Sequence, residues 1–359
     1  MNHALPGKLS RLIRQDIQSM HAYAVQDATG MVKLDAMENP HRLPEALQAE
    51  LGRRLGAVAL NRYPGERIDT LREALAQHAQ MPEGCALMLG NGSDELISLI
   101  AMACDVPGAS ILAPQPGFVM YAVSAQLQGL KFIGVDLTPD FELDEAAMLA
   151  AIDRHQPSII YLAYPNNPTA NLWDDAVIER IVQAAPGLVV IDEAYQPFSS
   201  RSYLDRLARH PHVLLMRTMS KFGLAGVRIG YMMGARALIA EIEKVRPPYN
   251  VSVLNAEAAL FALEHASVYD AQAADLREQR AALMRQLGAM PGVKAWRSDA
   301  NMILVRVPDA QAAFEGMKRR GVLVKNVSKM HPLLANCLRL TVGTADENAQ
   351  MIEALQASL

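Results

Sequence analysis

One short segment in the middle of the chain gathers side chains that could do chemistry together. The twelve residues from Arg217 to Arg228 hold three cations and two hydroxyls and no acid. Asp192 and Tyr195 precede this segment, at and just beyond the end of an apolar run. An amine, an anion site, a carboxylate and a phenol suit a cofactor that carries an aldehyde, a phosphate and a polar aromatic ring.

Lys221 is the candidate nucleophile of this segment. A lysine with the ordinary pKa of about 10.4 is protonated at neutral pH, and it reacts where burial or neighbouring positive charge favours the neutral amine. Arg217 and Arg228 are close enough in sequence to supply such charge. By itself a lysine after a strand is more often a solvated surface residue, so the interpretation depends on its neighbours.

Asp192 is the candidate carboxylate. It follows the apolar run Leu188–Ile191, which places it at the carboxyl end of a buried strand, where open α/β sheets form their ligand crevices. A loop acid or a helix cap is an equally frequent role for such a residue. Tyr195 and Lys221 nearby favour the functional interpretation.

The turn 90–95 is a candidate phosphate site. It is not a dinucleotide fingerprint, because Glu95 stands where the last glycine is required. At a helix start, free backbone N–H groups and the helix dipole favour a phosphate near Gly92, Ser93 and Asp94. The common alternative is a helix cap without a ligand.

The elements that must position these groups are those of an α/β fold. Short apolar runs alternate with helical segments from about 43 to 245, which predicts a mostly parallel, seven-stranded sheet covered on both faces. The predicted strands are 86–89, 110–113, 131–135, 158–163, 188–191, 213–216 and 230–233. The predicted helices are 95–104, 120–128, 145–155 and 174–184, and a long helical stretch, 255–288, follows them.

The length of 359 residues fits one large and one smaller domain. We expect an N-terminal arm over 1–42, a large domain over 43–248 and a small α/β domain over 249–359.

Composition excludes several classes of protein. A hydrophobic content of 51%, a net charge of -4 and a pI near 6.2 indicate an ordinary globular protein without the basic excess of a nucleic-acid binder. We find no signal-peptide core and no run of about 18 apolar residues, so we expect a cytoplasmic enzyme without a membrane span. Cys85, Cys104 and Cys337 are far apart, which indicates buried thiols and no disulfide framework or metal site.

These segments together resemble the fold-type I aminotransferases, which depend on pyridoxal 5'-phosphate (PLP), and within them the histidinol-phosphate aminotransferase family. The resemblance runs from Glu38-Asn39-Pro40 to Gly343. It implies that Lys221 forms the Schiff base with PLP, that Asp192 pairs with the ring nitrogen, and that Tyr195 contacts the ring hydroxyl. The positions matched to the cofactor phosphate are Gly92, Ser93, Asp94, Thr218, Ser220 and Arg228.

Further contacts to the cofactor ring are implied by the same resemblance. Phe118 matches the aromatic residue that stacks on the ring, although it could be a core phenylalanine, and Asn167 matches the residue that contacts the ring oxygen. Ala170 stands where glycine is usual. A positive φ at this position would disfavour alanine. Lys221 and Arg228 stand one residue closer in sequence than in many relatives. We expect the loop between them to be shorter and the role of Arg228 to be unchanged.

The resemblance also implies contacts to the substrate and to a second subunit. Arg339 matches the arginine that binds the substrate carboxylate or phosphate, for which its planar fork is suited. Lys325 stands where many relatives carry a second arginine, and Asn167 and Tyr23 are further candidates. Tyr63 matches a residue that reaches the cofactor of the neighbouring subunit, which implies a homodimer with shared sites. The arm is then expected to pack on the small domain and on the partner subunit.

The implied reaction is transamination from L-histidinol phosphate to 2-oxoglutarate, which gives imidazole acetol phosphate and glutamate in histidine biosynthesis. An aromatic amino acid aminotransferase and a threonine-phosphate decarboxylase on the same fold remain alternatives. A PLP-sensing regulator would need a basic DNA-binding module, for which the chain has no room.

Overall fold

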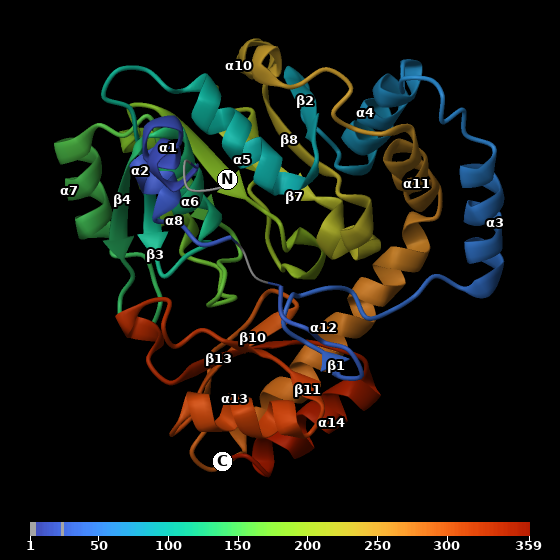
Figure 1. Ribbon diagram of the computed structural model, residues 1–359, viewed down its shortest axis with the longest axis vertical. Helices are drawn as coiled ribbons and strands as arrows, with labels where there is room; N and C mark the ends of the chain where they lie inside the picture. Colours follow the sequence, from blue (N-terminus) through green and yellow to red (C-terminus); the bar gives the residue numbers. More distant parts are fainter. Residues whose placement is uncertain (1–4, 23–24) are drawn as a thin grey trace.

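The predicted alternation of strands and helices folds into a central seven-stranded sheet with the order β2-β8-β7-β6-β5-β3-β4 (Figure 1). The computed structural model of the chain describes residues 5–22 and 25–359. The strands of the sheet are β2 (Cys85–Gly90), β3 (Ser110–Gln115), β4 (Lys131–Asp136), β5 (Ile159–Ala163), β6 (Leu188–Asp192), β7 (Val213–Thr218) and β8 (Gly230–Ala235). Only β8 is antiparallel to its neighbours β2 and β7, so the prediction of a mostly parallel sheet is confirmed.

Two layers of helices cover this sheet because the side chains of each buried strand alternate between its faces. The helices are α3 (Glu45–Gly56), α4 (Glu66–His78), α5 (Gly92–Ala103), α6 (Met120–Gln128), α7 (Glu145–His155), α8 (Asp175–Ala184), α9 (Leu204–Leu207), α10 (Arg236–Ile242) and α11 (Val253–Glu264). On β5, Ile160 and Leu162 join the core cluster under α4, α7, α8 and α11, whereas Tyr161 joins the cluster under α5, α6 and α10.

A second, smaller sheet lies below the first in Figure 1. It is antiparallel with the order β12-β13-β10-β9, and helices pack against it. The elements of this part of the chain are α12 (Ala266–Gly288), β9 (Lys294–Ala295), β10 (Met302–Arg306), α13 (Ala310–Arg319), β11 (Val322–Leu323), β12 (Lys325–Asn326), β13 (Cys337–Thr341) and α14 (Ala345–Gln356).

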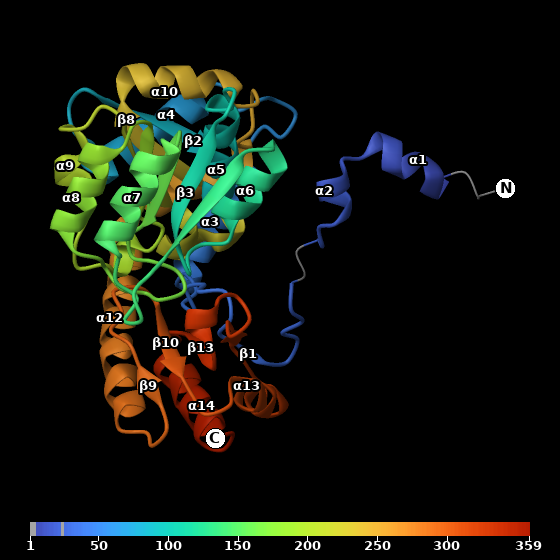
Figure 2. The same ribbon diagram turned by 90° about the vertical axis from the view of Figure 1, so that its left-hand side faces the viewer.

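The N-terminal arm joins the small domain. Its strand β1 (Val32–Lys33) pairs in parallel with β11, and Leu34 and Met37 are buried in the small-domain core. The helices α1 (Leu5–Leu12) and α2 (Gln15–Gln18) lie to one side of the large domain in Figure 2. Arg14, between them, donates to the carbonyls of Gln126 and Leu127 in α6, each at 2.7 Å. The segment 28–37 of the arm therefore packs against the elements that follow α12.

Packing divides the predicted helical stretch 255–288 into two helices with different partners. The first, α11, ends before His265, and its Ala256, Ala259 and Leu260 belong to the core of the large domain. The second, α12, contributes Ala273, Leu276, Leu283 and Leu287 to the core of the small domain. We propose that the domains divide near the start of α12 instead of at 248/249.

Among the described residues, none of the helices combines the length and the apolar character needed to cross a membrane. The three cysteines are free thiols; Cys85 and Cys337 are buried, and Cys104 is partly buried.

Candidate functional site

A cavity of about 350 Å³ lies at the carboxyl ends of β5, β6 and β7, beside the start of α5. The arm residues 36–38 line it from the small-domain side. The structure brings ten of the predicted site residues to its wall: Ser93, Asp94, Phe118, Asn167, Asp192, Tyr195, Thr218, Ser220, Lys221 and Arg228.

Strand alternation decides which of the neighbouring polar residues face this cavity. Asp192 and Thr218 lie on the face of β6 and β7 that α5 and α6 cover, and both line the cavity. Glu193 and Arg217, one position away, fall on the opposite face and form a buried ion pair of 2.8 Å. The expectation that Arg217 would supply charge to Lys221 was therefore wrong, because its guanidinium is neutralised behind the sheet.

The Glu193–Arg217 pair fastens the ends of two strands that carry site residues. Besides Arg217, the Glu193 carboxylate accepts hydrogen bonds from the Ser202 hydroxyl at 2.9 Å and from the Tyr203 backbone N–H at 2.6 Å. A buried charge with this many partners is satisfied, whereas removal of one partner would leave the other unpaired. The pair therefore supports the relative placement of Asp192 and Thr218.

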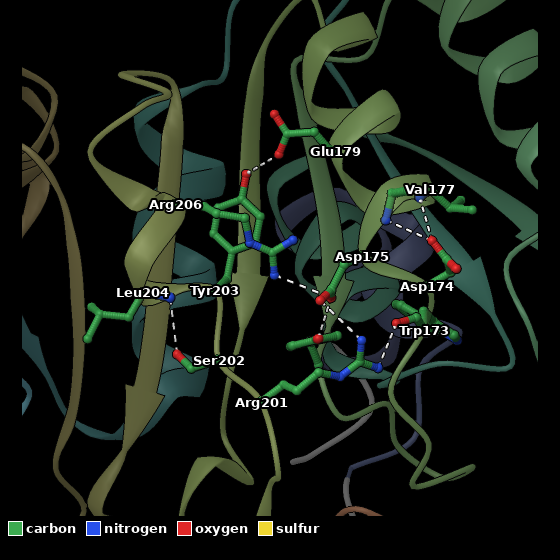
Figure 3. Close-up of polar contacts among 12 residues, drawn as sticks. Trp173, Asp174, Asp175, Val177, Glu179, Arg201, Ser202, Tyr203, Leu204 and Arg206 are labelled. Carbon is green, nitrogen blue, oxygen red and sulfur yellow. Dashed lines mark hydrogen bonds and ion pairs between the residues drawn. The ribbon is translucent and has the colours of Figure 1, made fainter.

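A second polar network holds the segment that follows Tyr195. Figure 3 shows Arg201 and Arg206 directed at Asp175, at the start of α8. Asp174 caps this helix by accepting hydrogen bonds from two backbone N–H groups. The loop between β5 and α8, which contains Asn167, is thus tied to the loop after β6.

The amine of Lys221 lies in surroundings that disfavour its charged form. Its Nζ donates a hydrogen bond of 3.0 Å to the backbone carbonyl of Ala36 in the arm. Desolvation, followed by repulsion from Arg339 and a smaller effect of Arg228, lowers the pKa of Lys221 to about 8, although Glu38 acts in the opposite direction. At pH 7 roughly a tenth of this lysine is therefore a neutral nucleophile, far more than at the ordinary pKa of a lysine.

Asp192 is buried, with only 4% of its surface exposed. Burial raises the pKa of this carboxyl to about 6, although hydrogen bonds act in the opposite direction. Its Oδ2 accepts a hydrogen bond of 2.7 Å from the Tyr121 hydroxyl, and its Oδ1 accepts one of 3.0 Å from the Ala194 backbone N–H. The carboxyl is thus largely an anion at neutral pH, and neither of these two hydrogen-bond donors is a cation.

Donors that suit an anion gather where α5 begins. Gly92 has φ +77°, and a side chain there would meet the Arg228 guanidinium at 2.6 Å. Arg228 reaches Asp94 at 3.3 Å and the Ser220 hydroxyl at 3.5 Å, and Thr218 donates to Ser220 at 3.0 Å. The shortened connection from Lys221 therefore still delivers Arg228 to the cavity.

Arg339 contacts the wall of the cavity through Asn167. Its guanidinium donates to Asn167 Oδ1 at 2.8 Å and to the backbone carbonyl of Asp35 at 2.6 Å. Lys325 is its register partner on β12, so the two side chains share one face of the small sheet. Neither Arg339 nor Lys325 is among the residues that line the cavity.

Ala170 adopts the positive φ that the glycine of related chains suggested. Its φ is 64°, its side chain is buried, and its N–H donates to the Asn166 carbonyl at 2.9 Å. The loop therefore keeps its turn despite the added methyl group, at some cost in backbone strain.

Tyr63 lies apart from the cavity of its own subunit. It is 75% exposed and stacks on Tyr249 with ring centroids 4.2 Å apart. The candidate Tyr23 lies outside the described residues.

Some residues at the site were not recognised from the sequence. Tyr121 contacts Asp192, and the only signal for it was its position three residues after Phe118, one turn along a helix. Arg217 was recognised as a cation but its pairing with Glu193 was not, although opposite charges adjoin predicted site residues at the ends of two strands. The carbonyls of Asp35 and Ala36 carry no sequence signal.

Replacement of Arg339 by leucine is expected to raise the pKa of Lys221 by roughly one unit, because it removes the largest repulsive charge acting on the ammonium. The pH dependence of Lys221 modification by a small electrophile in the cofactor-free protein, read by peptide mass spectrometry, measures this. Arg228→Leu should give a smaller rise. An unchanged or lower midpoint in Arg339→Leu would contradict the assignment of the shift.

Asp192→Asn is expected to stabilise the cofactor-free protein more at pH 8 than at pH 5. Because folding raises this pKa from 3.8 to about 6, the folded state binds the proton more tightly, and stability falls as pH rises through this window. The loss approaches roughly 3 kcal/mol above pH 7, and asparagine avoids it. Urea unfolding at both pH values tests this, with Asp140→Asn, which is exposed, as the control. Equal effects at both pH values would refute it.

Comparison with known proteins places the chain in a family. Residues 29–355 match the aminotransferase class I and II family. The chain is 76% identical to histidinol-phosphate aminotransferase from Polaromonas naphthalenivorans over 99% of this chain and 98% of that protein.

The structure of histidinol-phosphate aminotransferase from Sinorhizobium meliloti in complex with pyridoxal-5'-phosphate has a TM-score of 0.84 at 23% identity, over 96% of each chain. L-threonine-O-3-phosphate decarboxylase from Porphyromonas gingivalis shares the fold at a TM-score of 0.77 and 20% identity, over 91% of this chain and 98% of that one. The chain belongs to the aminotransferase class I and II family and, within it, to the histidinol-phosphate aminotransferases.

Proposed function

We propose that this chain is a PLP-dependent aminotransferase that converts L-histidinol phosphate and 2-oxoglutarate to imidazole acetol phosphate and glutamate. The observation that carries the proposal is Lys221, whose amine has a pKa of about 8 and lines the same cavity as Asp192, Tyr195 and Asn167. The high identity to histidinol-phosphate aminotransferases supports the choice of substrate. A cytoplasmic location stays a prediction.

The residues of the cavity fit PLP chemically. A phosphate would be held by the N-terminus of α5 at Gly92 and Ser93 and by Arg228. A side chain at Gly230 would meet the backbone of Gly92 and Ser93 at 2.5 Å, so these glycines let the strand and the helix start approach closely. The hydroxyls of Thr218 and Ser220 would complete this cradle, and Phe118 would cover the ring.

Bound there, PLP supplies an aldehyde carbon for the lysine amine and a ring that takes up electrons from the substrate. Asp192 would favour a protonated ring nitrogen, and Asn167 and Tyr195 would hydrogen-bond the ring oxygen. Burial raises the pKa of Tyr195, so its hydroxyl remains a donor at neutral pH. The Lys221 amine acts at the α carbon of the amino donor, where it removes a proton as general base and returns one as general acid.

Arg339 would bind the anionic end of both substrates, and Lys325 on the same face would add positive charge beside it. In the structure, Arg339 donates to the Asn167 side chain and to the Asp35 carbonyl. A substrate carboxylate or phosphate would compete with these two neutral acceptors for the guanidinium. A charged acceptor binds a guanidinium more strongly than a neutral one does, so the exchange is favourable.

The proposed assembly is a homodimer with shared sites. Tyr63 is exposed and lies outside the cavity of its own subunit, and it borders a hollow lined by Arg54, Arg62 and Arg67. Apolar side chains nearby in sequence and on the arm are also exposed, with Leu12 at 71% and Leu60 at 69%. A partner that covered these residues would account for their exposure.

The substrate is tested by incubation of the purified protein with histidinol phosphate, phenylalanine or threonine phosphate, each with 2-oxoglutarate. The highest kcat/KM is expected for histidinol phosphate, and Lys221→Ala should lose roughly 10²- to 10⁴-fold in kcat because it lacks the general base. A preference for phenylalanine would change the substrate. Release of carbon dioxide from threonine phosphate without formation of a keto acid would change the reaction class.

The shared site is tested by mixed dimers. Tyr63→Ala is expected to weaken PLP binding, and a refolded mixture of Tyr63→Ala and Lys221→Ala chains should be more active than either variant alone, because one site of each mixed dimer keeps both residues. Sedimentation should give twice the chain mass of 39.2 kDa. A monomer, or a mixture no more active than its components, would contradict the proposal.

A further inference from the structure

Tyr121 is a buried residue outside the cavity wall that contacts the site residue Asp192 directly. Its hydroxyl donates to Asp192 Oδ2 at 2.7 Å, and its side chain is 2% exposed. The second oxygen of the same carboxylate accepts a hydrogen bond of 3.0 Å from the Ala194 backbone N–H. Each oxygen of Asp192 therefore has one donor, and one of the two donors is a side chain that can be changed.

Aromatic packing holds the Tyr121 ring in one orientation. The ring stacks on Tyr161 with centroids 4.3 Å apart and planes at 8°, and it meets Phe118 edge to face at 5.5 Å. Tyr161 comes from the middle of β5, and its own hydroxyl is directed at the Ile97 carbonyl of α5 at 3.4 Å. Because α6 and β5 both fix this ring, the Tyr121 hydroxyl cannot easily turn away from the carboxylate.

A carboxylate without such donors would rotate freely about its last side-chain bond. With one donor on each oxygen, the plane of the Asp192 carboxylate is set before a ligand arrives. The buried charge also needs these donors, because no cation among the described contacts neutralises it. Burial and the nearby carboxylate raise the pKa of Tyr121 well above its ordinary value, so it remains a protonated donor.

We propose that Tyr121 is a positioning residue, which orients and supports the Asp192 carboxylate as the partner of the cofactor ring nitrogen without touching the cofactor. The proposal rests on the proposed function, since it assigns a supporting residue to the same site. The site then includes a residue behind the cavity wall, Tyr121 in the first turn of α6, together with Tyr161 of β5, on which Tyr121 stacks.

The test is a double-mutant cycle on cofactor affinity. Cofactor-free Tyr121→Phe, which keeps the ring and loses the hydroxyl, should bind PLP roughly 10- to 100-fold more weakly in an equilibrium titration. Tyr161→Phe is the matched control, because it removes a hydroxyl from the stacked neighbour and should change the affinity by less than about two-fold. In the Asp192→Asn background, Tyr121→Phe should have little further effect, since the interaction to be lost is already altered.

The loaded enzyme gives a second readout. The Tyr121→Phe holoenzyme should lose kcat while the KM of the amino donor changes little, because the ring nitrogen is distant from the substrate anion site in Arg339. Thermal unfolding identifies any variant that fails to fold. Equal PLP affinity of Tyr121→Phe and wild type, or an undiminished effect of Tyr121→Phe in the Asp192→Asn background, would overturn the proposal. Wild-type protein that does not bind PLP would instead refute the proposed function.

Discussion

The site depends on the removal of two ionisable groups from water at one edge of a sheet. Desolvation is the largest influence on both Lys221 and Asp192, and it moves their pKa values toward each other, to about 8 and about 6. A less buried lysine would stay protonated, and a less supported carboxylate would take up a proton. The surrounding structure must therefore exclude solvent and still provide donors and acceptors for each group.

Several remote parts of the chain meet that requirement together. The arm provides the Ala36 carbonyl for Lys221 and the Asp35 carbonyl for Arg339, and it lies against the small domain through β1. The large sheet provides the strand ends. The small domain provides Arg339, whose charge repels the ammonium of Lys221. The pKa of the reactive amine thus depends on burial at the sheet edge and on Arg339 of the small domain.

Desolvation of charge also carries a cost in stability, which buried partners reduce. Behind the sheet, Glu193 and Arg217 satisfy each other and hold the ends of β6 and β7. In front, Tyr121 and the Ala194 N–H satisfy Asp192. Because successive strand residues alternate between faces, Asp192 lines the cavity whereas its neighbour Glu193 supports the strand ends from the opposite face.

The sequence allowed the strands, their mostly parallel pairing and the wall of the cavity to be predicted, because apolar runs mark buried strands and polar residues follow them. It misassigned Arg217, since proximity in sequence does not say which face of a strand a side chain occupies until the register is known. It did not reveal that α11 packs with the large domain, because a helical pattern does not name its partner.

What the sequence by itself determined was the kind of chemistry: the amine, the carboxylate and the anion-binding groups are fixed by residue type at the ends of predictable strands. What only the tertiary structure decided was the environment of these groups. The pKa of Lys221 depends on Arg339, which is 118 positions away in the chain, and the carboxylate of Asp192 depends on a tyrosine from another helix. Electrostatic and hydrogen-bonding effects follow distance in space, and only folding sets that distance.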